Sequence, residues 1–427
     1  METLKTKDTL RFGLAGCPVG HSVSPELHRL LFEVKGIRAE YRLFDIPPEQ
    51  LPAKAAQLLA LDGCNITIPH KQTIIPFLSG LSEQARRFGA VNTLYRGRGY
   101  NTDVDGFSRS LSALCGENLP DRALVLGSGG TASMMTGHLL DRGLSVTVAV
   151  RDPSSRSAQA LAVRYPGRVT VLPLAEIHGG FPLVCNATPC GMHPHRDEAP
   201  LTQQALNGVQ FLFDAIYNPC ETLLAKQAKA LGAQVKCGMT MLVYQAAAAQ
   251  EQWLDTAFTD GELAPVVREM ELLTSAKYEA EGRPILLSGF MGSGKTYYGR
   301  RLARSLGLPF IDVDQEITAA AKKSIPELFA TRGEEGFRLL ERETVLRLLN
   351  QPGQAVMALG GGALHHADNA ARFRERGYLI FVDTPFETCL SRIEGDTNRP
   401  NAAGDVRGLY ERRLPLYRQA AHYCFRP

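Results

Sequence analysis

A glycine-rich segment that ends in a lysine and a threonine carries the clearest chemical signal in this sequence. Residues 289–296 read GFMGSGKT and fit the pattern G-x-x-x-x-G-K-[ST]. In such a loop, backbone N–H groups and the N-terminus of the next helix face a polyphosphate. Lys295 would reach the β- and γ-phosphates, and Thr296 would hold Mg²⁺. The strand pattern at 285–287 and the helical pattern at 297–306 argue against a chance glycine turn. The other predicted cradle residues are Gly292, Ser293 and Gly294.

A second glycine-rich turn lies between a strand and a helix earlier in the chain. Residues 121–127 form an apolar strand pattern, and Gly127, Gly129 and Ala132 follow the spacing G-x-G-x-x-A where a helix begins. A further strand pattern at 144–150 completes a β–α–β unit. This combination is the fingerprint of a dinucleotide-binding Rossmann unit, in which glycines let the backbone approach a pyrophosphate. We therefore predict a second nucleotide site in a different domain.

The residues after the second strand of this unit indicate which dinucleotide binds. NAD-selective units usually place an acidic residue at the end of that strand, where it binds the ribose 2′-hydroxyl. Here Arg151 stands first, Asp152 follows it, and Arg156 lies nearby. Because two arginines suit a 2′-phosphate, the sequence favours NADP.

Polar residues also follow several predicted strands in residues 1–110. Ser22 and Ser24 precede a proline and a helical pattern; they could cap that helix or present hydroxyls to a polyol. Lys71 ends the alternating segment 64–71, where a lysine is usually a solvated surface residue. Taken one at a time, these residues do not indicate a function.

Taken together, these segments resemble shikimate dehydrogenase. The motifs S-x-S-P, N-x-T-x-P-x-K, A-V-N-T and N-T-D-x-x-G occur in that order within residues 22–106, and the resemblance covers residues 8–275. It implies Lys71 and Asp103 as a catalytic pair, because a ketone reduced by hydride needs a proton that a positioned ammonium can supply. Asp103 would also lie among the residues that surround a shikimate-like acid, which are otherwise Ser22, Ser24, Asn65, Thr67 and Asn92.

The same resemblance assigns roles to residues after the Rossmann motif. It makes Gln245 a substrate contact and places Tyr217 and Gly238 near the nicotinamide. The helix that begins near Gly238 should pack back on the first domain, so the substrate domain is expected to be discontinuous in sequence. The predicted dinucleotide contacts are Gly127, Ser128, Gly129, Gly130, Thr131, Ala132, Arg151, Arg156, Ile216, Tyr217 and Gly238.

Acidic and glycine-rich segments follow the phosphate loop in residues 284–427. Asp312 and Asp314 lie two apart on a predicted strand and so share one face. They could form a solvated strand edge, but after a phosphate loop such acids more often serve Mg²⁺ and the phosphate acceptor. Three glycines at 360–362 follow another strand and allow a ligand close to the backbone.

With the phosphate loop, these segments resemble shikimate kinase. The shared motifs are GFMGSGKT, D-x-D, F-R-x-x-E, GGG, a lid arginine before a proline, and R-x-P-x-Y. The resemblance implies that Asp314 orients the attacking hydroxyl and that Asp312 supports Mg²⁺. Positioning and charge neutralisation carry most of phosphoryl-transfer catalysis. The implied arginine and glycine contacts are Arg338, Gly361 and Arg413 on the acid, Arg399 on the transferring phosphoryl group, and Arg392 on adenine.

The C-terminal segment departs from this second family. The family continues past the position of Tyr417 with a strand, an adenine-contacting loop and a closing helix, whereas this sequence ends at Pro427. We expect the chain to stop within or just after that strand, which would leave one edge of the nucleotide site incomplete. The lid differs as well, since Asn401 and Ala402 stand where the family has aliphatic residues.

Composition is that of a globular protein with several domains. The chain has 427 residues, 44% hydrophobic and 21% charged, with a net charge of +3. No basic block predicts nucleic-acid or membrane binding, and no apolar run predicts a membrane span, so a cytoplasmic protein is expected. Nine scattered cysteines without a C-x-x-C pair indicate neither a disulfide framework nor a zinc site. A homodimer is left open.

We therefore predict an α/β protein with a discontinuous substrate domain (1–110 and 238–274), an NADP-binding Rossmann domain (111–237), a linker (275–283), and a P-loop, nucleoside-monophosphate-kinase-like domain with a parallel sheet (284–427). The expected function is NADPH-dependent reduction of 3-dehydroshikimate and then ATP- and Mg²⁺-dependent phosphorylation of shikimate. The alternatives are a quinate-oxidising dehydrogenase with an inactive kinase-like domain, and a metabolite-sensing regulator built from silent copies of both domains.

Overall fold

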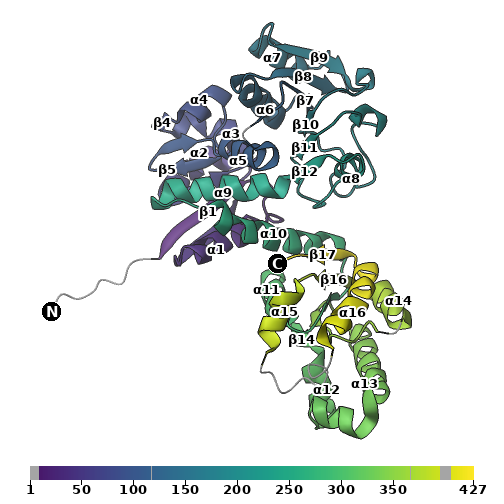
Figure 1. Cartoon of the computed structure of the whole chain (residues 1–427). Helices are drawn as coiled ribbons and strands as arrows, with labels where there is room; N and C mark the ends of the chain where they lie inside the picture. Colours follow the sequence, from purple (N-terminus) through teal and green to yellow (C-terminus); the bar gives the residue numbers. More distant parts are fainter. Residues whose placement is uncertain (1–8, 117, 366, 395–404) are drawn as a thin grey trace, which may run out of the picture. The chain divides into compact units, whose positions relative to one another are not determined.

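The computed structural model describes residues 9–116, 118–365, 367–394 and 405–427 (Figure 1). By its internal contacts the chain divides into two compact units, Met1–Met270 and Glu271–Pro427. The first unit contains two sheets and the second contains one. Each unit is taken by itself below.

The first sheet has the strand order β2-β1-β3-β5-β6-β4. It is mixed, because β1 pairs in parallel with β2 and β3, whereas β3 and β5 run antiparallel. The carboxyl ends of β1 and β3 therefore meet at one edge of the sheet. The strands are β1 Leu10–Gly16, β2 Ala39–Asp45, β3 Gly63–Ile66, β4 Gly80–Leu81, β5 Thr93–Tyr95 and β6 Arg98–Tyr100. The helices are α1 Ser24–Val34, α2 Leu51–Leu59, α3 His70–Thr73 and α4 Glu83–Phe88.

The second sheet is wholly parallel, with the order β12-β11-β10-β7-β8-β9. The central strands are buried on both faces, which explains their continuous apolar sequences. The order reverses between β7 and β10, the point where ligands bind in such sheets. The strands are β7 Arg122–Leu126, β8 Ser145–Val150, β9 Val169–Pro173, β10 Leu183–Asn186, β11 Phe211–Asp214 and β12 Gln234–Cys237. The helices are α5 Asp103–Cys115, α6 Gly130–Asp141, α7 Arg156–Arg164 and α8 Leu223–Ala230.

Helix α9 (Gly238–Leu254) leaves the second sheet and returns to the first (Figure 1). Its Trp253 stacks on Phe12 of β1 with ring centroids 4.8 Å apart, and the indole N–H donates to the carbonyl of Leu94 at 3.0 Å. Near its other end α9 packs closely against α5, because a Cβ on Gly106 would come within 2.7 Å of the Met241 carbonyl oxygen. Residues after the second sheet in the sequence therefore pack against the first sheet.

The second unit has a parallel sheet in the order β14-β15-β13-β16-β17, with helices packed against it. Strand β13 lies at the centre, and the phosphate-loop segment follows it directly. The strands are β13 Ile285–Ser288, β14 Phe310–Asp312, β15 Val356–Ala358, β16 Tyr378–Val382 and β17 Tyr423–Phe425. The helices are α11 Lys295–Leu306, α12 Val313–Ala321, α13 Ile325–Leu349, α14 Ala367–Arg376, α15 Phe386–Ile393 and α16 Val406–Ala420.

Two segments differ from the sequence-based expectations. The predicted linker 275–283 begins inside α10 (Asp260–Glu279). Its Ser275 is buried and lies 2.7 Å, hydroxyl to hydroxyl, from Tyr378, which also donates to Glu279 at 2.8 Å. The first residues of the predicted linker are thus helical and packed against β16. The helix expected to begin near Thr331 instead begins at Ile325 after a Ser324–Glu327 capping box, and it kinks at Gly333.

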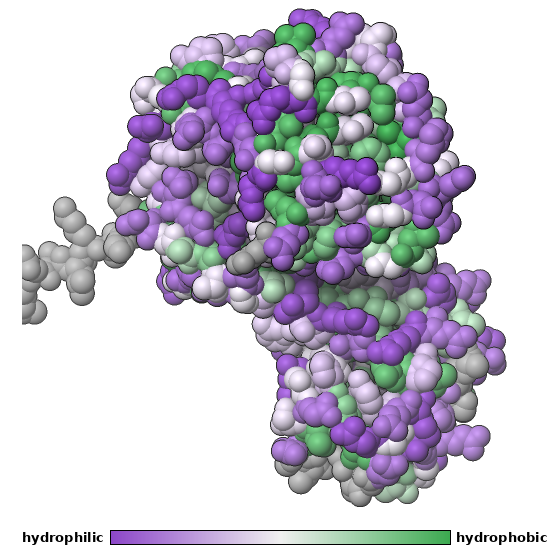
Figure 2. Space-filling view, turned by 45° about the horizontal axis from the view of Figure 1, so that its top comes forward, coloured by the Kyte–Doolittle hydropathy of each residue, from purple (hydrophilic) through white to green (hydrophobic). Residues whose placement is uncertain are grey.

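The molecular surface carries the mixture of polar and apolar residues that is usual for a globular protein. Hydrophilic and apolar residues are interspersed over the visible face of both units (Figure 2). Among the helices in the described part of the chain, none is both long and apolar enough to cross a membrane.

A buried histidine on helix α1 packs against the first sheet. His28 of α1 is 1% exposed, and its ring stacks on Tyr41 with centroids 4.2 Å apart. Gln250 of α9 lies 3.1 Å from its Nδ1 atom. Burial lowers the pKa of His28 from 6.5 to about 3, so the folded protein holds the neutral ring.

We expect His28 to make the first unit sensitive to acid. Its pKa is lower in the folded state than in the unfolded state, so its contribution to stability is present above pH 6.5 and is lost as pH falls toward 3. Between pH 7 and pH 5 this loss amounts to about 2 kcal/mol. Urea unfolding followed by fluorescence of Trp253, the chain's one tryptophan, measures it.

The matched variants are His28→Gln, which cannot titrate, and His178→Gln, at an exposed position. The wild type and His178→Gln should lose about 2 kcal/mol more than His28→Gln over this pH range. Equal losses in all three would contradict the assignment.

Candidate active sites

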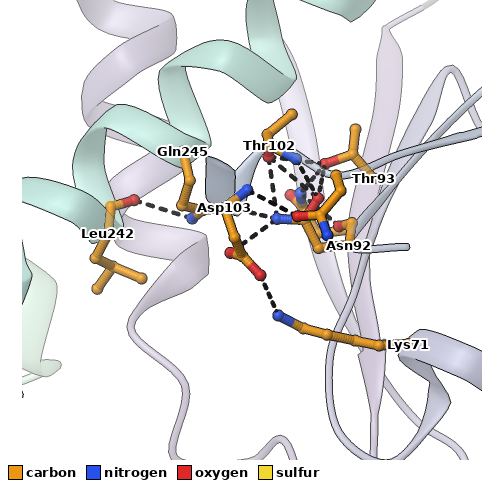
Figure 3. A network of polar contacts seen from close by, with 9 residues as sticks. Lys71, Asn92, Thr93, Thr102, Asp103, Leu242 and Gln245 are labelled. Carbon is orange, nitrogen blue, oxygen red and sulfur yellow. Dashed lines mark hydrogen bonds and ion pairs between the residues drawn. The ribbon is translucent and has the colours of Figure 1, made fainter. Parts of the chain in front are cut away.

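Lys71 and Asp103 form an ion pair at the edge of the first sheet (Figure 3). The Lys71 Nζ atom lies 2.5 Å from Asp103 Oδ2, and the two side chains are 31% and 25% exposed. Lys71 comes from the short helix α3 after β3, and Asp103 is the first residue of α5. The pair can therefore reach a ligand while it remains partly shielded from water.

Asn92 holds the other oxygen of this carboxylate. Its Nδ2 atom donates to Asp103 Oδ1 at 3.0 Å and lies 3.4 Å from Gln245 Oε1 (Figure 3). The Asn92 Oδ1 atom accepts from the backbone N–H of Thr102 at 2.8 Å. With Lys71 on Oδ2 and Asn92 on Oδ1, the charged form of Asp103 is bonded at both oxygens.

The remaining predicted substrate residues lie on neighbouring loops and strands. Ser24 is the first residue of α1, and its N–H donates to Ser22 Oγ at 3.1 Å, so this pair closes the start of the helix. A Cβ on Gly16 would meet Thr67 Cγ2 at 2.3 Å, which places the end of β1 against the residue that follows β3. Asn65 is 6% exposed and bonds to neighbours inside the sheet.

A cavity of about 810 Å³ opens at the switch point of the second sheet. Gly127, at φ +104, turns the chain away from β7, and a Cβ there would come within 3.2 Å of Thr188. The N-terminus of α6 follows at Gly130. The predicted cofactor residues that line the cavity are Gly127, Ser128, Gly129 and Arg151. Asp152, Ser155, Ser157 and Thr188 line it as well, although the sequence reasoning assigned none of them to the site.

Several predicted cofactor residues do not line this cavity. Arg156 is the exposed first residue of α7. Gly238 begins α9, where a Cβ would lie 2.1 Å from the Ala215 carbonyl oxygen, so a close backbone approach accounts for this glycine. The others outside the cavity wall are Gly130, Thr131, Ala132, Ile216 and Tyr217.

The phosphate loop has the backbone that its sequence predicts. Gly289, Gly292 and Gly294 have φ values of +147°, +75° and +94°, which favour glycine. A Cβ on Gly292 would also lie 2.4 Å from the Cys389 carbonyl oxygen. Lys295 Nζ donates to the Gly289 and Phe290 carbonyls at 2.9 Å each. The ammonium is thus held over the curled loop.

The predicted metal residues lie together beside this loop. The Thr296 hydroxyl donates to Asp312 Oδ2 at 3.1 Å, so the two oxygens are neighbours. Arg392 donates from Nη1 to the Gly292 carbonyl at 3.2 Å, which places it against the loop. Arg399 lies outside the described residues.

The three glycines at 360–362 pack against the predicted acid-binding residues. A Cβ on Gly360 would meet Glu341 Oε1 at 2.1 Å and Asp314 Oδ1 at 3.0 Å, and one on Gly362 would meet the Arg338 guanidinium at 2.2 Å. The structure therefore brings Asp314 and Arg338 to the same loop. Arg413 reaches it as well, because its Nη1 atom donates to the Gly361 carbonyl at 3.1 Å.

Arg338 has a buried partner that the site prediction omitted. Its Nη1 atom lies 2.7 Å from Glu341 Oε2, and the two side chains are 7% and 2% exposed. Burial raises the pKa of Glu341, while Arg338 and Arg413 act in the opposite direction. The F-R-x-x-E motif could have indicated this pair, since residues three apart meet on one helix face.

The site prediction also omitted Thr93, Thr102 and Tyr417. The Tyr417 hydroxyl donates to the Gly361 carbonyl.

Family models match both parts of the chain. The model described as "Shikimate dehydrogenase substrate binding domain" matches residues 14–94, and the one described as "Shikimate kinase" matches residues 291–426. Both resemblances inferred from the motifs are thereby confirmed.

Curated relatives and solved structures match the first part. The NADP(+) shikimate dehydrogenases of Geobacillus kaustophilus and Archaeoglobus fulgidus are both 39% identical to the chain; the matches cover 57% of this chain and 91% and 92% of theirs. A chorismate mutase/shikimate 5-dehydrogenase fusion protein from Clostridium acetobutylicum aligns with a TM-score of 0.58 at 33% identity, over 64% of this chain and all of that one. A shikimate 5-dehydrogenase from Thermus thermophilus, solved with NADP(H) and shikimate, aligns at 0.55 and 33%, over 61% and 99% of the two chains. The chain therefore belongs to the shikimate dehydrogenase family, carries a shikimate kinase domain after it, and is built as a bifunctional enzyme of the shikimate pathway.

Proposed function

We propose that the first unit reduces 3-dehydroshikimate to shikimate with NADPH and that the second phosphorylates the shikimate 3-hydroxyl with Mg-ATP. The observation that carries this proposal is the Lys71–Asp103 ion pair, held by Asn92 beside Gln245. The NADP(H) and shikimate bound to the Thermus thermophilus relative support the choice of ligands. The product of the first reaction is then the substrate of the second.

In the first reaction, bound NADPH supplies the hydride and the protein supplies the proton. Lys71 donates a proton to the oxygen of the former ketone, since an ammonium within hydrogen-bond reach can act as a general acid. Asp103 accepts a hydrogen bond from the neighbouring substrate hydroxyl and keeps Lys71 in place. Asn92 fixes the carboxylate, so the geometry is set before the substrate arrives.

The residues of the second sheet fit a dinucleotide. The cavity is bordered by a glycine turn and the N-terminus of α6, a combination that suits a pyrophosphate. Arg151 lines the cavity beyond the end of β8, where the adenosine ribose lies in a Rossmann unit. We assign Arg151 to the 2′-phosphate.

Arg151→Ala should therefore lower kcat/KM for NADPH about 10–100-fold, because the variant loses one hydrogen bond to a charged group. It should leave kcat/KM for NADH unchanged. Steady-state kinetics with both cofactors measure this, and Arg142→Ala, an exposed arginine at the end of α6, is the control. An equal loss with both cofactors would remove the 2′-phosphate assignment.

The second unit fits Mg-ATP and a ring acid. The phosphate-loop glycines and Lys295 suit the phosphates, and the Thr296 and Asp312 oxygens suit a hard cation. Bound Mg-ATP supplies the phosphoryl group, while Asp314 orients the attacking hydroxyl. Arg338 and Arg413 bind the carboxylate of the acid, which fixes the ring against the 360–362 loop. We propose that Arg392 binds adenine and that Arg399 binds the transferring phosphoryl group.

One coupled assay on the purified chain tests both halves. The chain receives 3-dehydroshikimate, NADPH and Mg-ATP, and NADPH loss and ADP release are followed together. We expect both NADPH loss and ADP release. In a separate assay of the reverse reaction, we expect the first unit to oxidise shikimate much faster than quinate. NADPH loss without ADP release would leave only the first activity. A homodimer and a cytoplasmic location remain predictions, which sedimentation and cell fractionation would check.

A further inference from the structure

Four polar side chains form a hydrogen-bonded row that ends at the proposed catalytic pair. We call this set, Tyr41, Asn65, Thr93 and Asn92, the polar row. Its members come from or adjoin three strands of the first sheet, β2, β3 and β5. Two of its residues, Tyr41 and Thr93, have no role in the proposed reaction, and the other two were assigned above to the substrate.

The first half of the polar row sets the orientation of the Asn65 amide. The Tyr41 hydroxyl donates to Asn65 Oδ1 at 2.8 Å. Burial raises the pKa of Tyr41 well above 10, so the hydroxyl keeps the proton that it donates. The Asn65 Nδ2 atom then faces Thr93 Oγ1 at 3.1 Å and the Asn92 carbonyl at 3.2 Å. Both amide hydrogens of Asn65 are thus directed toward β5.

The second half sets the orientation of the Asn92 amide. Because Thr93 Oγ1 accepts from Asn65, its own hydrogen is available to Asn92 Oδ1, at 3.1 Å. The Asn92 Oδ1 atom also receives the Thr102 backbone N–H. The amide nitrogen is left facing Asp103 Oδ1 at 3.0 Å (Figure 3). One continuous path of hydrogen bonds therefore runs from the Tyr41 hydroxyl to the Asp103 carboxylate, and such aligned bonds polarise one another.

Burial makes this arrangement necessary. Thr93 is 0% exposed, and Asn92 and Asn65 are 4% and 6% exposed, so bulk water has little access to replace a missing partner. An Asn92 amide turned by 180° would place its oxygen against the Asp103 carboxylate, where two acceptors repel. Asp103 Oδ1 would then lose its donor, and the carboxylate would be held at Oδ2 by Lys71 alone.

We infer that Tyr41 and Thr93 are positioning residues for the reduction: through Asn65 and Asn92, and together with the Thr102 backbone N–H, they hold the Asn92 amide with its nitrogen toward Asp103. This inference rests on the proposed roles of Lys71 and Asp103. Neither Tyr41 nor Thr93 needs to touch the substrate. Their effect appears in kcat, because they set the geometry of the pair that transfers the proton, and neither of them lines the cofactor cavity.

The test uses full-length variants that remove single hydroxyls. Tyr41→Phe and Thr93→Val should each lower kcat for reduction about 10-fold, the cost of one buried hydrogen bond, with KM for NADPH unchanged. Thr93→Ser keeps the hydroxyl and should restore kcat. Tyr95→Phe, on β5 of the same sheet, is the matched control and should behave as the wild type. Unchanged urea midpoints of Trp253 fluorescence would show that the first unit remains folded.

A double-mutant cycle tests whether the effect passes through Asn92. In an Asn92→Ala background, Tyr41→Phe should lower kcat further by less than about 2-fold, since coupled residues are not additive. A full 10-fold further loss would overturn the inference, as would wild-type kcat in both Tyr41→Phe and Thr93→Val. Absence of NADPH-dependent reduction of 3-dehydroshikimate by the wild-type chain would instead overturn the proposed function itself, so the two failures are distinguishable.

Discussion

Lys71→Ala should lower kcat for the reduction of 3-dehydroshikimate by about 10²–10⁴-fold, the usual contribution of a general acid. The Lys71 ammonium is the cation bonded to Asp103, and its removal also leaves that carboxylate without its 2.5 Å partner. NADPH oxidation under saturating substrate measures the loss. Phosphorylation of supplied shikimate should be unchanged, because the kinase residues belong to the other unit.

The matched control is Lys54→Ala, which changes an exposed lysine on helix α2 of the same unit. It should keep both activities within about 2-fold, as is usual for surface substitutions. Loss of both activities in Lys71→Ala would show that the two halves depend on each other. Full reduction activity would show that another group supplies the proton.

Arg338→Leu should destabilise the second unit by about 3–5 kcal/mol, because it leaves Glu341 as a buried charge without its partner. Hydrogen–deuterium exchange of peptides from α13 and β15 measures this. The folded fraction of this variant should also show a raised KM for shikimate, since Arg338 is proposed to bind the carboxylate of shikimate. Reduction by the first unit should be retained.

Two further variants separate stability from binding. Arg347→Leu removes a surface pair with Glu316, at 53% and 45% exposure, and should cost less than about 1 kcal/mol. Arg338→Leu with Glu341→Met replaces both buried partners by apolar groups and should recover most of the stability, but not the KM. Recovery of both would mean that Arg338 has no part in binding the acid.

The two nucleotide loops were readable from the sequence because each depends on a few consecutive residues. Gly292 and Gly294 have the positive φ values that their spacing in the phosphate loop predicts, and Gly127 turns the chain after β7. Glycine is required wherever backbone or ligand approaches closely, so its spacing records local geometry. The motif order likewise indicated both families, which the family models confirm.

Partnerships between distant residues were not readable in this way. Nothing in the spacing of Tyr41, Asn65 and Thr93 indicates a shared hydrogen-bonded row, because the row exists only once β2, β3 and β5 lie in one sheet. Arg156 fits a sequence argument for the 2′-phosphate as well as Arg151 does, yet only Arg151 lines the cavity. The helical start of the segment 275–283 packs against Tyr378, about 100 residues later.

By itself, the sequence determined the two families, the two nucleotide-binding loops and the types of side chain available for proton and phosphoryl transfer. These features depend on residues close together in the chain, where backbone conformation follows residue type. Only the tertiary structure decided that Asn92 holds Asp103, that Glu341 neutralises Arg338, and that Gly360 and Gly362 pack against Asp314 and Arg338. Hydrogen bonds and ion pairs act over a few ångströms, and folding alone brings such residues within that range.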